Sequence, residues 1–139
     1  MNKEDFKKFV KLKNLRISIP RLLIYQVLSN AKHPLTAQEI YGLILKDKKK
    51  VGLTSIYRTL DLFEAIGIVF KLVTNSTVKY LLCKSSNHHH HLICKACGEV
   101  IELELCDLSE LIKKIMELTN YNVTDHQLSF FGYCKSCKA

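Results

Sequence analysis

The chain has 139 residues, of which 47% are hydrophobic and 24% charged, and its formal net charge is +8. This composition is typical of one or two small globular domains, and no apolar run approaches the roughly 18 residues that a membrane span requires. The N-terminus lacks the apolar core and small-residue cleavage site of an export signal. We therefore expect a cytoplasmic protein whose six cysteines stay reduced and serve as metal ligands or catalytic groups.

The charges and the potential metal ligands occupy different halves of the chain. The first 87 residues hold 16 Lys or Arg against 6 Asp or Glu, whereas the remainder holds 5 against 7. The second half also holds five of the six cysteines and five of the six histidines. The excess of cations favours a polyanionic partner, because Lys and Arg release the counterions condensed on phosphates. A Lys-rich surface that only promotes solubility is the alternative.

Three helices are predicted in the first half. Ser18 and Pro20 mark the start of the first helix. The Thr-Ala-Gln-Glu pattern at residues 36–39 is a capping box, in which a hydroxyl and a carboxylate each accept from a free backbone N–H, and it precedes the second helix. The third helix is expected to be capped by Thr54 or Ser55.

Two short apolar segments follow the third helix. Residues 68–73 and 78–82 are separated by Thr-Asn-Ser-Thr and predict a β-hairpin. The lysine-rich run at residues 46–50, between the second and third helices, is expected to be a solvated loop. Three helices and a hairpin make a winged helix-turn-helix, whose third helix would enter a major groove of DNA.

The second half changes from helical to strand periodicity. We expect a small α+β unit with strands at residues 91–94 and 99–105, a helix at 108–118 capped by residues 107–110, and a strand at 123–134. The whole chain is therefore predicted to be α+β. Its domains are expected at residues 1–84, for DNA binding, and at residues 85–139, for metal binding.

Four cysteines form two CxxC motifs, Cys94 with Cys97 and Cys134 with Cys137. Four thiolates arranged as a tetrahedron, about 2.3 Å from the ion, make a closed structural zinc site. Such a site supplies an apparent ~10–16 kcal/mol near neutral pH, which would explain how so small a unit stays folded. The alternative is one redox-active CxxC motif and a chance pair.

Four consecutive histidines, His88, His89, His90 and His91, directly precede the first CxxC motif. In an extended segment alternate side chains face opposite sides, so His88 and His90 point one way while His89 and His91 point the other. The tract therefore has the arrangement needed to supply ligands to two different sites. A solvated surface run is the alternative.

Five segments of the chain resemble, in order, the ferric uptake regulator (Fur) superfamily of bacterial metal-sensing transcription factors. They are LRISIPRLLIYQVL, LTAQEIY, TSIYRTLDLFEAIGIV, HHHHLICKACGEVIE and DHQLSFFGYCKSC. The resemblance implies an N-terminal winged helix, a C-terminal α/β dimerisation domain with structural zinc on the four CxxC cysteines, and a sensing site at the interdomain hinge. It also implies a homodimer on palindromic operator DNA, with no enzymatic activity, no membrane and no small-molecule substrate.

The same resemblance implies which residues sense the regulatory metal. Relatives use the second and fourth histidines of the row, here His89 and His91, with a ligand from the end of the wing hairpin. Iron and peroxide sensors usually carry Glu or Asp after an aromatic residue there, but this chain has Leu81. Cys83, two residues further on, resembles the zinc uptake regulators (Zur). Thiolate and imidazole suit Zn²⁺, whereas carboxylate oxygen suits Mn²⁺ or Fe²⁺.

The remaining ligand of the sensing site has two candidates from the sequence. Glu102 matches an acidic ligand position in several members of the superfamily. His33 resembles the ligand that the first domain of iron and peroxide sensors supplies, although it lies one residue farther from the Thr-Ala step than in some relatives. The sequence favours neither of them.

An accessory metal site is implied on the other face of the histidine row. It would comprise His88, His90, His126 and an acidic residue. The acid of the family falls on Ser109, so the neighbouring Glu110 substitutes only if the helix is shifted. Cys106 is similar to a cysteine of some Zur sequences, and an ordinary core cysteine is the alternative there.

The resemblance further assigns DNA contacts to five residues. Tyr57 would contact thymine methyl groups, and Arg58 guanine or the backbone, with Ser55 and Thr59 beside them. Arg16 matches a basic residue that relatives send into an adjacent minor groove. We therefore expect a zinc-sensing repressor of metal-uptake genes that binds DNA as a dimer when it is metal-loaded.

Two other functions are compatible with parts of the sequence. One is an iron or peroxide sensor of the same superfamily, with Fe²⁺ or Mn²⁺ at the regulatory site. The other is a zinc hydrolase, in which histidines and Glu102 hold an ion with an open position that activates water. The chain lacks HExxH and HxE…PCxxC motifs, and a basic winged helix would have no purpose in a hydrolase.

Overall fold

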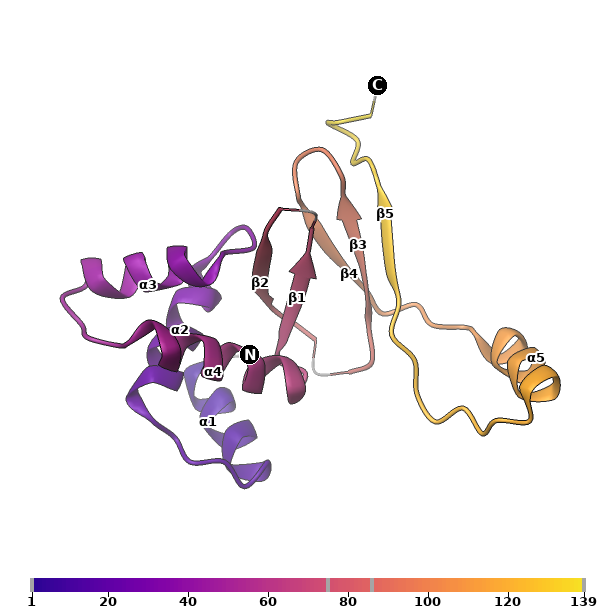
Figure 1. Ribbon diagram of the computed structural model, residues 1–139, viewed down its shortest axis with the longest axis horizontal. Helices are drawn as coiled ribbons and strands as arrows, with labels where there is room; N and C mark the ends of the chain where they lie inside the picture. The colour runs from indigo at the N-terminus through magenta and orange to yellow at the C-terminus, as the bar shows by residue number, and fades with distance from the viewer. Residues whose placement is uncertain (1, 75, 86, 139) are drawn as a thin grey trace. The chain divides into compact units, whose positions relative to one another are not determined.

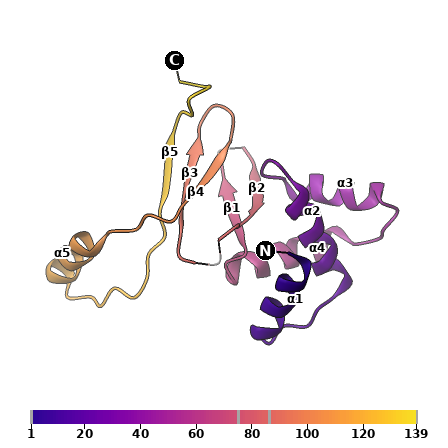
Figure 2. The same ribbon diagram turned by 180° about the vertical axis from the view of Figure 1, so that it is seen from behind.

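The computed structural model of the protein describes residues 2–74, 76–85 and 87–138. The chain forms two compact units, an N-terminal unit that ends at residue 86 and a C-terminal unit that begins at residue 87. Both units combine helices with strands (Figures 1 and 2), so the α+β class predicted from the sequence is confirmed. None of the described helices has the length and apolar character needed to cross a membrane.

Four helices make up most of the N-terminal unit: α1 (Lys3–Leu12), α2 (Ile19–Asn30), α3 (Ala37–Lys46) and α4 (Leu53–Ala65). The predicted capping box opens α3, where the Glu39 N–H donates to the Thr36 hydroxyl at 3.1 Å and the Thr36 N–H donates to the Glu39 carboxylate at 2.7 Å. The hydrogen bond from the Thr36 backbone also lowers the pKa of the Glu39 carboxyl. These bonds satisfy two N–H groups that an uncapped helix leaves without partners.

The predicted start of α2 at Ser18 and Pro20 is confirmed, whereas the start of α4 differs from the sequence-based expectation. Ser18 is the N-cap residue of α2, but its side chain makes no capping hydrogen bond. The N-cap of α4 is Gly52, which has an extended backbone, so Thr54 and Ser55 lie inside the first turn instead of capping it. A β-region backbone at the N-cap position, and not the presence of a hydroxyl nearby, decides where the helix begins.

The apolar faces of the four helices meet in one core. Phe6 of α1 stacks on Tyr25 of α2 with ring centroids 4.1 Å apart, and it meets Phe63 of α4 edge-on at 5.6 Å. Ile56 and Leu60 of α4 are also completely buried in this cluster. Because α4 buries this one face, its opposite face is left for solvent or a partner.

The wing is an antiparallel hairpin of β1 (Val69–Val73) and β2 (Val78–Leu82). Leu35, ahead of α3, exchanges both backbone hydrogen bonds with Tyr80 of β2, at 2.7 and 2.9 Å. Beyond β2, the Cys83 N–H donates to the Ile68 carbonyl at 2.9 Å. The pairing therefore fixes the backbone of Cys83 at the end of the wing, and the helices and hairpin together form the predicted winged helix.

The C-terminal unit contains β3 (His90–Cys94), β4 (Val100–Leu103), α5 (Ser109–Thr119) and β5 (Ser129–Gly132). The strands form a sheet of order β4-β3-β5, in which β3 is antiparallel to β4 and parallel to β5. The last strand is shorter than expected. The residue before α5 is Leu108, and the Ser109 hydroxyl donates to the Asp107 carboxylate, so the predicted cap does not form.

Candidate metal centres and nucleic-acid surface

The two CxxC motifs meet because of the strand order. Cys94 ends β3, and Cys134 follows the end of β5. These strands are parallel neighbours, so their carboxyl ends lie at the same edge of the sheet. All four sulfur atoms, of Cys94, Cys97, Cys134 and Cys137, lie within 4.8 Å of one another. Gly98, with φ of 74°, allows the turn after Cys97, a conformation that side-chain-bearing residues rarely adopt.

The thiols of this cluster do not have equal acidity. Backbone N–H groups of Cys97 and Cys134 lower the pKa of the Cys94 thiol to about 6, and the Cys134 N–H lies 3.3 Å from its sulfur. Hydrogen bonds with the Cys134 and Cys97 thiols raise the pKa of Cys137 to about 12. Four sulfur donors at this separation fit a tetrahedral zinc ion, whose charge would favour the thiolate form of all four.

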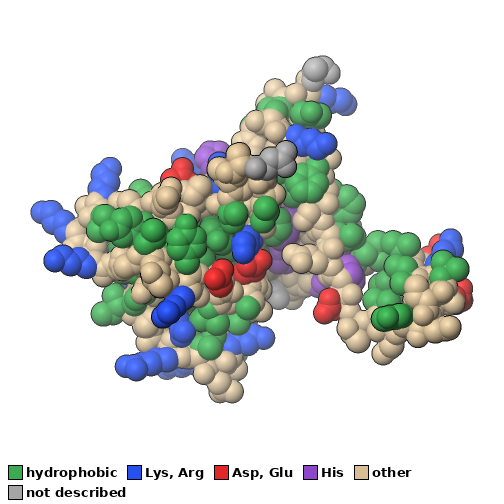
Figure 3. All heavy atoms as spheres, viewed as in Figure 1, with side chains coloured by type: hydrophobic (Ala, Val, Ile, Leu, Met, Phe, Trp, Pro, Cys, Tyr) green, Lys and Arg blue, Asp and Glu red, His purple; other side chains and the backbone are tan. Residues whose placement is uncertain are grey.

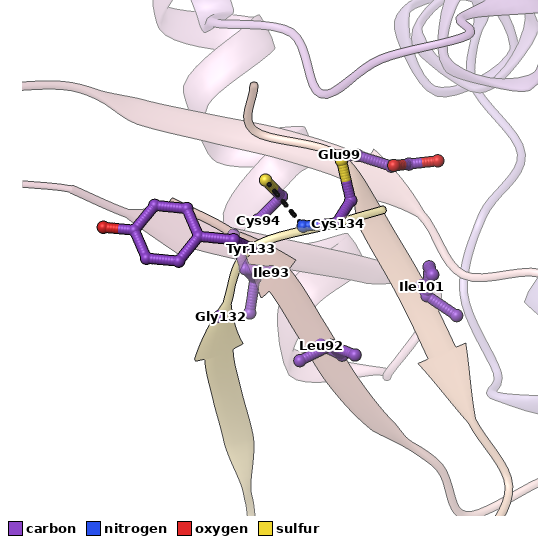
Figure 4. A pocket seen from close by; sticks show the side chains of 8 residues that line it. All are labelled: Leu92, Ile93, Cys94, Glu99, Ile101, Gly132, Tyr133 and Cys134. Carbon is purple, nitrogen blue, oxygen red and sulfur yellow. Dashed lines mark hydrogen bonds between the residues drawn. The ribbon is translucent and has the colours of Figure 1, made fainter. Parts of the chain in front are cut away.

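The sheet surface beside the sulfur cluster carries a shallow hollow of about 80 Å³. Figure 4 shows Leu92 and Ile101 along this hollow, with Cys94 and Cys134 at one end and the Tyr133 ring beside them. The dashed line there is the hydrogen bond from the Cys134 N–H to the Cys94 sulfur. The lining is mostly apolar, so part of the sheet surface is uncovered within a single chain.

Three predicted sensing ligands come together within the C-terminal unit. His91 of β3 is the direct cross-strand partner of Glu102 in β4, so the two side chains share a face of the sheet. The His89 ring lies 4.9 Å from that of His91, and the ligand atoms of His89, His91 and Glu102 lie within 4.8 Å of one another. The three side chains thus form a cluster with two nitrogen donors and one oxygen donor.

The imidazoles of this cluster are prepared for coordination. His89 Nδ1 lies 2.7 Å from the Asn87 carbonyl. A carbonyl only accepts hydrogen bonds, so Nδ1 is the donor in this contact and Nε2 is the nitrogen left to bind a metal. Burial is the main cause that lowers the pKa of His91 to about 4. His91 is therefore neutral at pH 7, the form that binds metal.

The two other predicted sensing residues belong to the N-terminal unit. Cys83 follows β2 directly and is buried. His33 is exposed in the turn between α2 and α3. Cys83 precedes His89 by six positions in the sequence, whereas His33 is far from the histidine row along the chain.

A second ligand group occupies the other side of the histidine row. His88 Nε2 lies 2.9 Å from His126 Nε2 and 3.3 Å from His90 Nε2, while the Cys106 sulfur lies 3.0 Å from His126 Nε2. These four ligand atoms are all within 4.8 Å of one another. Cys106 is the fourth member of this group. Glu110, which was predicted for this site, lies in the first turn of α5 and is not a member of the group.

The exposed face of α4 carries most of the predicted DNA contacts. Ser55 and Arg58 are exposed, and 43% of the Tyr57 surface is accessible. Thr59 is only 6% exposed because it lies on the buried face of α4, so its exposure does not favour the predicted contact with DNA. Arg16 is exposed in the segment before α2, where its carbonyl accepts a hydrogen bond from the Arg21 guanidinium.

A winged helix joined to a unit with clustered cysteines and histidines is the architecture of a metal-dependent transcription regulator. Residues 12–131 match the model of the Ferric uptake regulator family, and the chain belongs to this family. Its members are DNA-binding, metal-binding regulators of transcription and not enzymes. The hydrolase interpretation of the sequence is therefore set aside.

Relatives of different kinds match most of the length of the chain. A Ferric uptake regulation protein of Neisseria meningitidis is 32% identical over 139 residues, covering 98% of this chain and 96% of its own. The Peroxide-responsive repressor PerR of Staphylococcus aureus is also 32% identical, over 89% of this chain and 83% of its own. A zinc uptake regulator solved with zinc and DNA has a TM-score of 0.76 at 21% identity, covering 97% of this chain and 91% of its own, which supports the fold alone.

Proposed function

We propose that this protein is a zinc-sensing repressor that binds palindromic operator DNA as a homodimer when metal-loaded and controls metal-uptake genes in the cytoplasm. The choice of zinc rests on two residues of the wing. Its end carries the buried thiol of Cys83, and Leu81 occupies the position where a carboxylate would favour iron. A soft sulfur together with imidazoles suits Zn²⁺. Four cysteines at the end of the C-terminal sheet would hold a separate structural zinc ion.

The proposed sensing ligands are Cys83, His89, His91 and Glu102. Six residue steps from Cys83 to His89 span at most about 20 Å, so the connection keeps the thiol within reach of the histidines. Glu102 is preferred to His33 because its carboxylate already shares a cluster with His89 and His91. Its oxygen is also the observation that favours the second candidate, an iron- or manganese-dependent sensor, since hard oxygen ligands suit Fe²⁺ and Mn²⁺.

Regulation would follow from which unit supplies each ligand. Cys83 belongs to the wing, and the other three belong to the C-terminal unit. One ion bound by ligands of both units would restrict the orientation of the winged helix. The protein would then lose less conformational entropy when it binds DNA. The coupling free energy between two such binding events is typically ~1–3 kcal/mol. By the same amount, DNA-bound protein must bind the metal more tightly than free protein does.

A homodimer is supported by apolar surface that a single chain leaves uncovered. The helix α5 has no buried residue, and Figures 1 and 2 show it apart from the three-stranded sheet of its unit. Leu111, Ile115 and Leu118 are exposed along it. An isolated helix of 11 residues is marginal in water, so a second copy that covers this face would stabilise it. Twofold symmetry of the protein would then require a palindromic operator.

The group of His88, His90, His126 and Cys106 is proposed as an accessory zinc site. Three imidazole nitrogens and one sulfur are a donor set that zinc accepts readily. The site has a thiol in place of the carboxylate predicted from the sequence, which shifts its preference further from Fe²⁺ and Mn²⁺. The sensing and accessory ions would then be bound on opposite sides of one short histidine segment.

The decisive experiment selects an operator from a randomised duplex pool and measures binding by fluorescence anisotropy, with free Zn²⁺, Fe²⁺ or Mn²⁺ buffered under anaerobic conditions. We expect zinc to promote binding at lower free concentration than the other ions. Cys83→Ser should abolish the zinc response while retaining the structural zinc. A response to Fe²⁺ that Cys83→Ser leaves unchanged would support the iron sensor. No specific duplex binding with any ion would overturn the proposal.

A further inference from the structure

Four lysines gather at the last residue of α3 and in the connection that follows it, here called the lysine loop and defined as residues 46–50. Its sequence is Lys-Asp-Lys-Lys-Lys, and all five residues are exposed. Figure 3 shows Lys and Arg side chains projecting from the end of the N-terminal unit where this loop lies. The single carboxylate of Asp47 leaves the loop with a formal charge of +3.

The lysine ammonium groups of this loop are available for a partner. Within the described residues, the ion pairs of the N-terminal unit join Lys7 to Glu4 and Lys71 to Glu64, and none involves the lysine loop. Four lysines with a single carboxylate among them repel one another, and the repulsion is relieved when a polyanion approaches. The loop therefore differs from the lysines of α1 and β1 that are already neutralised locally.

The backbone of the loop is held in a defined conformation. Lys48 has φ of 56°, in the left-handed region, and its N–H donates to the Leu45 carbonyl at 2.9 Å. The Lys49 N–H donates to the Ile44 carbonyl at 3.3 Å. Val51, directly after the loop, is buried in the helical core. The lysines are thus attached to a fixed turn and do not belong to a free tether.

The loop leads directly into the helix that carries Tyr57 and Arg58. Gly52 caps α4, so Lys50 is only three positions from its first residue, Leu53. In a helix-turn-helix the N-terminal residues of the recognition helix contact base edges inside the major groove. The segment that precedes such a helix must then cross the edge of the groove, which is lined by phosphates.

We propose that the lysine loop binds backbone phosphates at the edge of the groove that α4 enters. The inference rests on the proposed DNA-binding function and assigns the loop a separate role within it. Lysine is a flexible point charge without the fork geometry that reads a base, so these contacts add affinity to every sequence equally. Arg58 and Tyr57 would select the operator, and the lysine loop would set how strongly binding depends on salt.

The test compares the full-length zinc-loaded protein with two charge-matched variants. One is Lys49→Gln with Lys50→Gln in the loop, and the other is Lys113→Gln with Lys114→Gln in α5. Binding to the selected operator and to an unrelated duplex of equal length is measured between about 50 and 200 mM salt. Circular dichroism and light scattering verify that both variants keep the fold and the oligomeric state.

For the loop variant, the slope of log K against log salt should become shallower by about 0.9 for each lost phosphate contact, or about 1.8 per protomer. Affinity should fall for both duplexes by the same factor, so the preference for the operator is retained. The α5 variant should keep the slope of the unmodified protein. Equal slopes for the loop variant and the unmodified protein would overturn the assignment, whether or not the variant also lost its preference for the operator.

The outcomes separate this inference from the proposed function. If the unmodified protein binds the operator and the loop variant keeps its salt slope, only the phosphate-binding role fails. If the unmodified protein shows no specific duplex binding, the proposed function fails, and the phosphate-binding role fails with it.

Discussion

Arg58 and Thr59 are adjacent on α4 but have opposite environments. Arg58 is exposed, whereas Thr59 packs into the core beside Leu60. One residue step rotates a side chain by about 100° around a helix, which is enough to move it from the exposed side to the core. Polar residues that are adjacent in the sequence therefore need not contact the same partner. The burial of each residue distinguishes those that face solvent from those that face the core.

Arg58→Ala should weaken operator binding by ~1–3 kcal/mol or more, because it removes a guanidinium from the exposed face of α4 without changing the core. Fluorescence anisotropy with the selected operator measures this loss. Zinc content and thermal unfolding should match the unmodified protein. Operator affinity that survives the substitution would remove Arg58 from the DNA contacts.

Cys106→Ser and Glu110→Gln distinguish the two possible compositions of the accessory site. Serine keeps the size of the side chain but removes the soft donor 3.0 Å from His126. We expect Cys106→Ser to weaken the binding of one zinc ion per protomer by at least tenfold, whereas Glu110→Gln should have no effect. Competition with a chromophoric chelator measures this. If only Glu110→Gln weakened zinc binding, Glu110 and not Cys106 would be the fourth ligand of the accessory site.

At the scale of elements, α5 is the helix that its own chain stabilises least. Ile115→Glu should convert the dimer to a monomer, because it places a charge within the exposed apolar face that a second copy is proposed to cover. Lys114→Glu, which introduces the same side chain one position away, is the control. Light scattering coupled to size exclusion measures the mass. A dimer that tolerates Ile115→Glu would place the interface elsewhere.

Helix starts show how far local patterns predict elements. The capping box of Thr36 and Glu39 is confirmed, because both partners lie within one turn and need no other contact. The cap expected from Thr54 or Ser55 is wrong, since the N-cap residue of α4 is Gly52, which follows the buried Val51. Where a tertiary contact anchors the preceding residue, it overrides the local preference.

At the scale of the whole molecule, the two units differ in what stabilises them. The large buried cluster of aromatic and aliphatic side chains lies entirely within the N-terminal unit. The C-terminal unit buries few side chains among its described residues, chiefly those of β3. A structural zinc ion at the four cysteines would therefore supply much of the stability of the C-terminal unit, an apparent ~10–16 kcal/mol near neutral pH.

Removal of metal with a strong chelator should therefore unfold the C-terminal unit first. Amide hydrogen exchange should show loss of protection in β3 and β5, while α2 and α4 keep theirs. Cys97→Ser should reproduce the effect without a chelator. Protection in β3 that persists after complete zinc removal would show that the sheet is stable without the ion.

Short-range patterns in the sequence determined α2 to α5, the hairpin, the two CxxC pairs and the alternation of the four histidines, because each depends on residues within a few positions of one another. The helix α1 was not predicted from the sequence. The tertiary structure decided which distant residues come together. Strand register placed Glu102 opposite His91, and the parallel pairing of β3 with β5 joined the two CxxC pairs. The path of the chain brought Cys106 to His126. Such contacts span more than ten residues, and only the packing of the complete sheet specifies them.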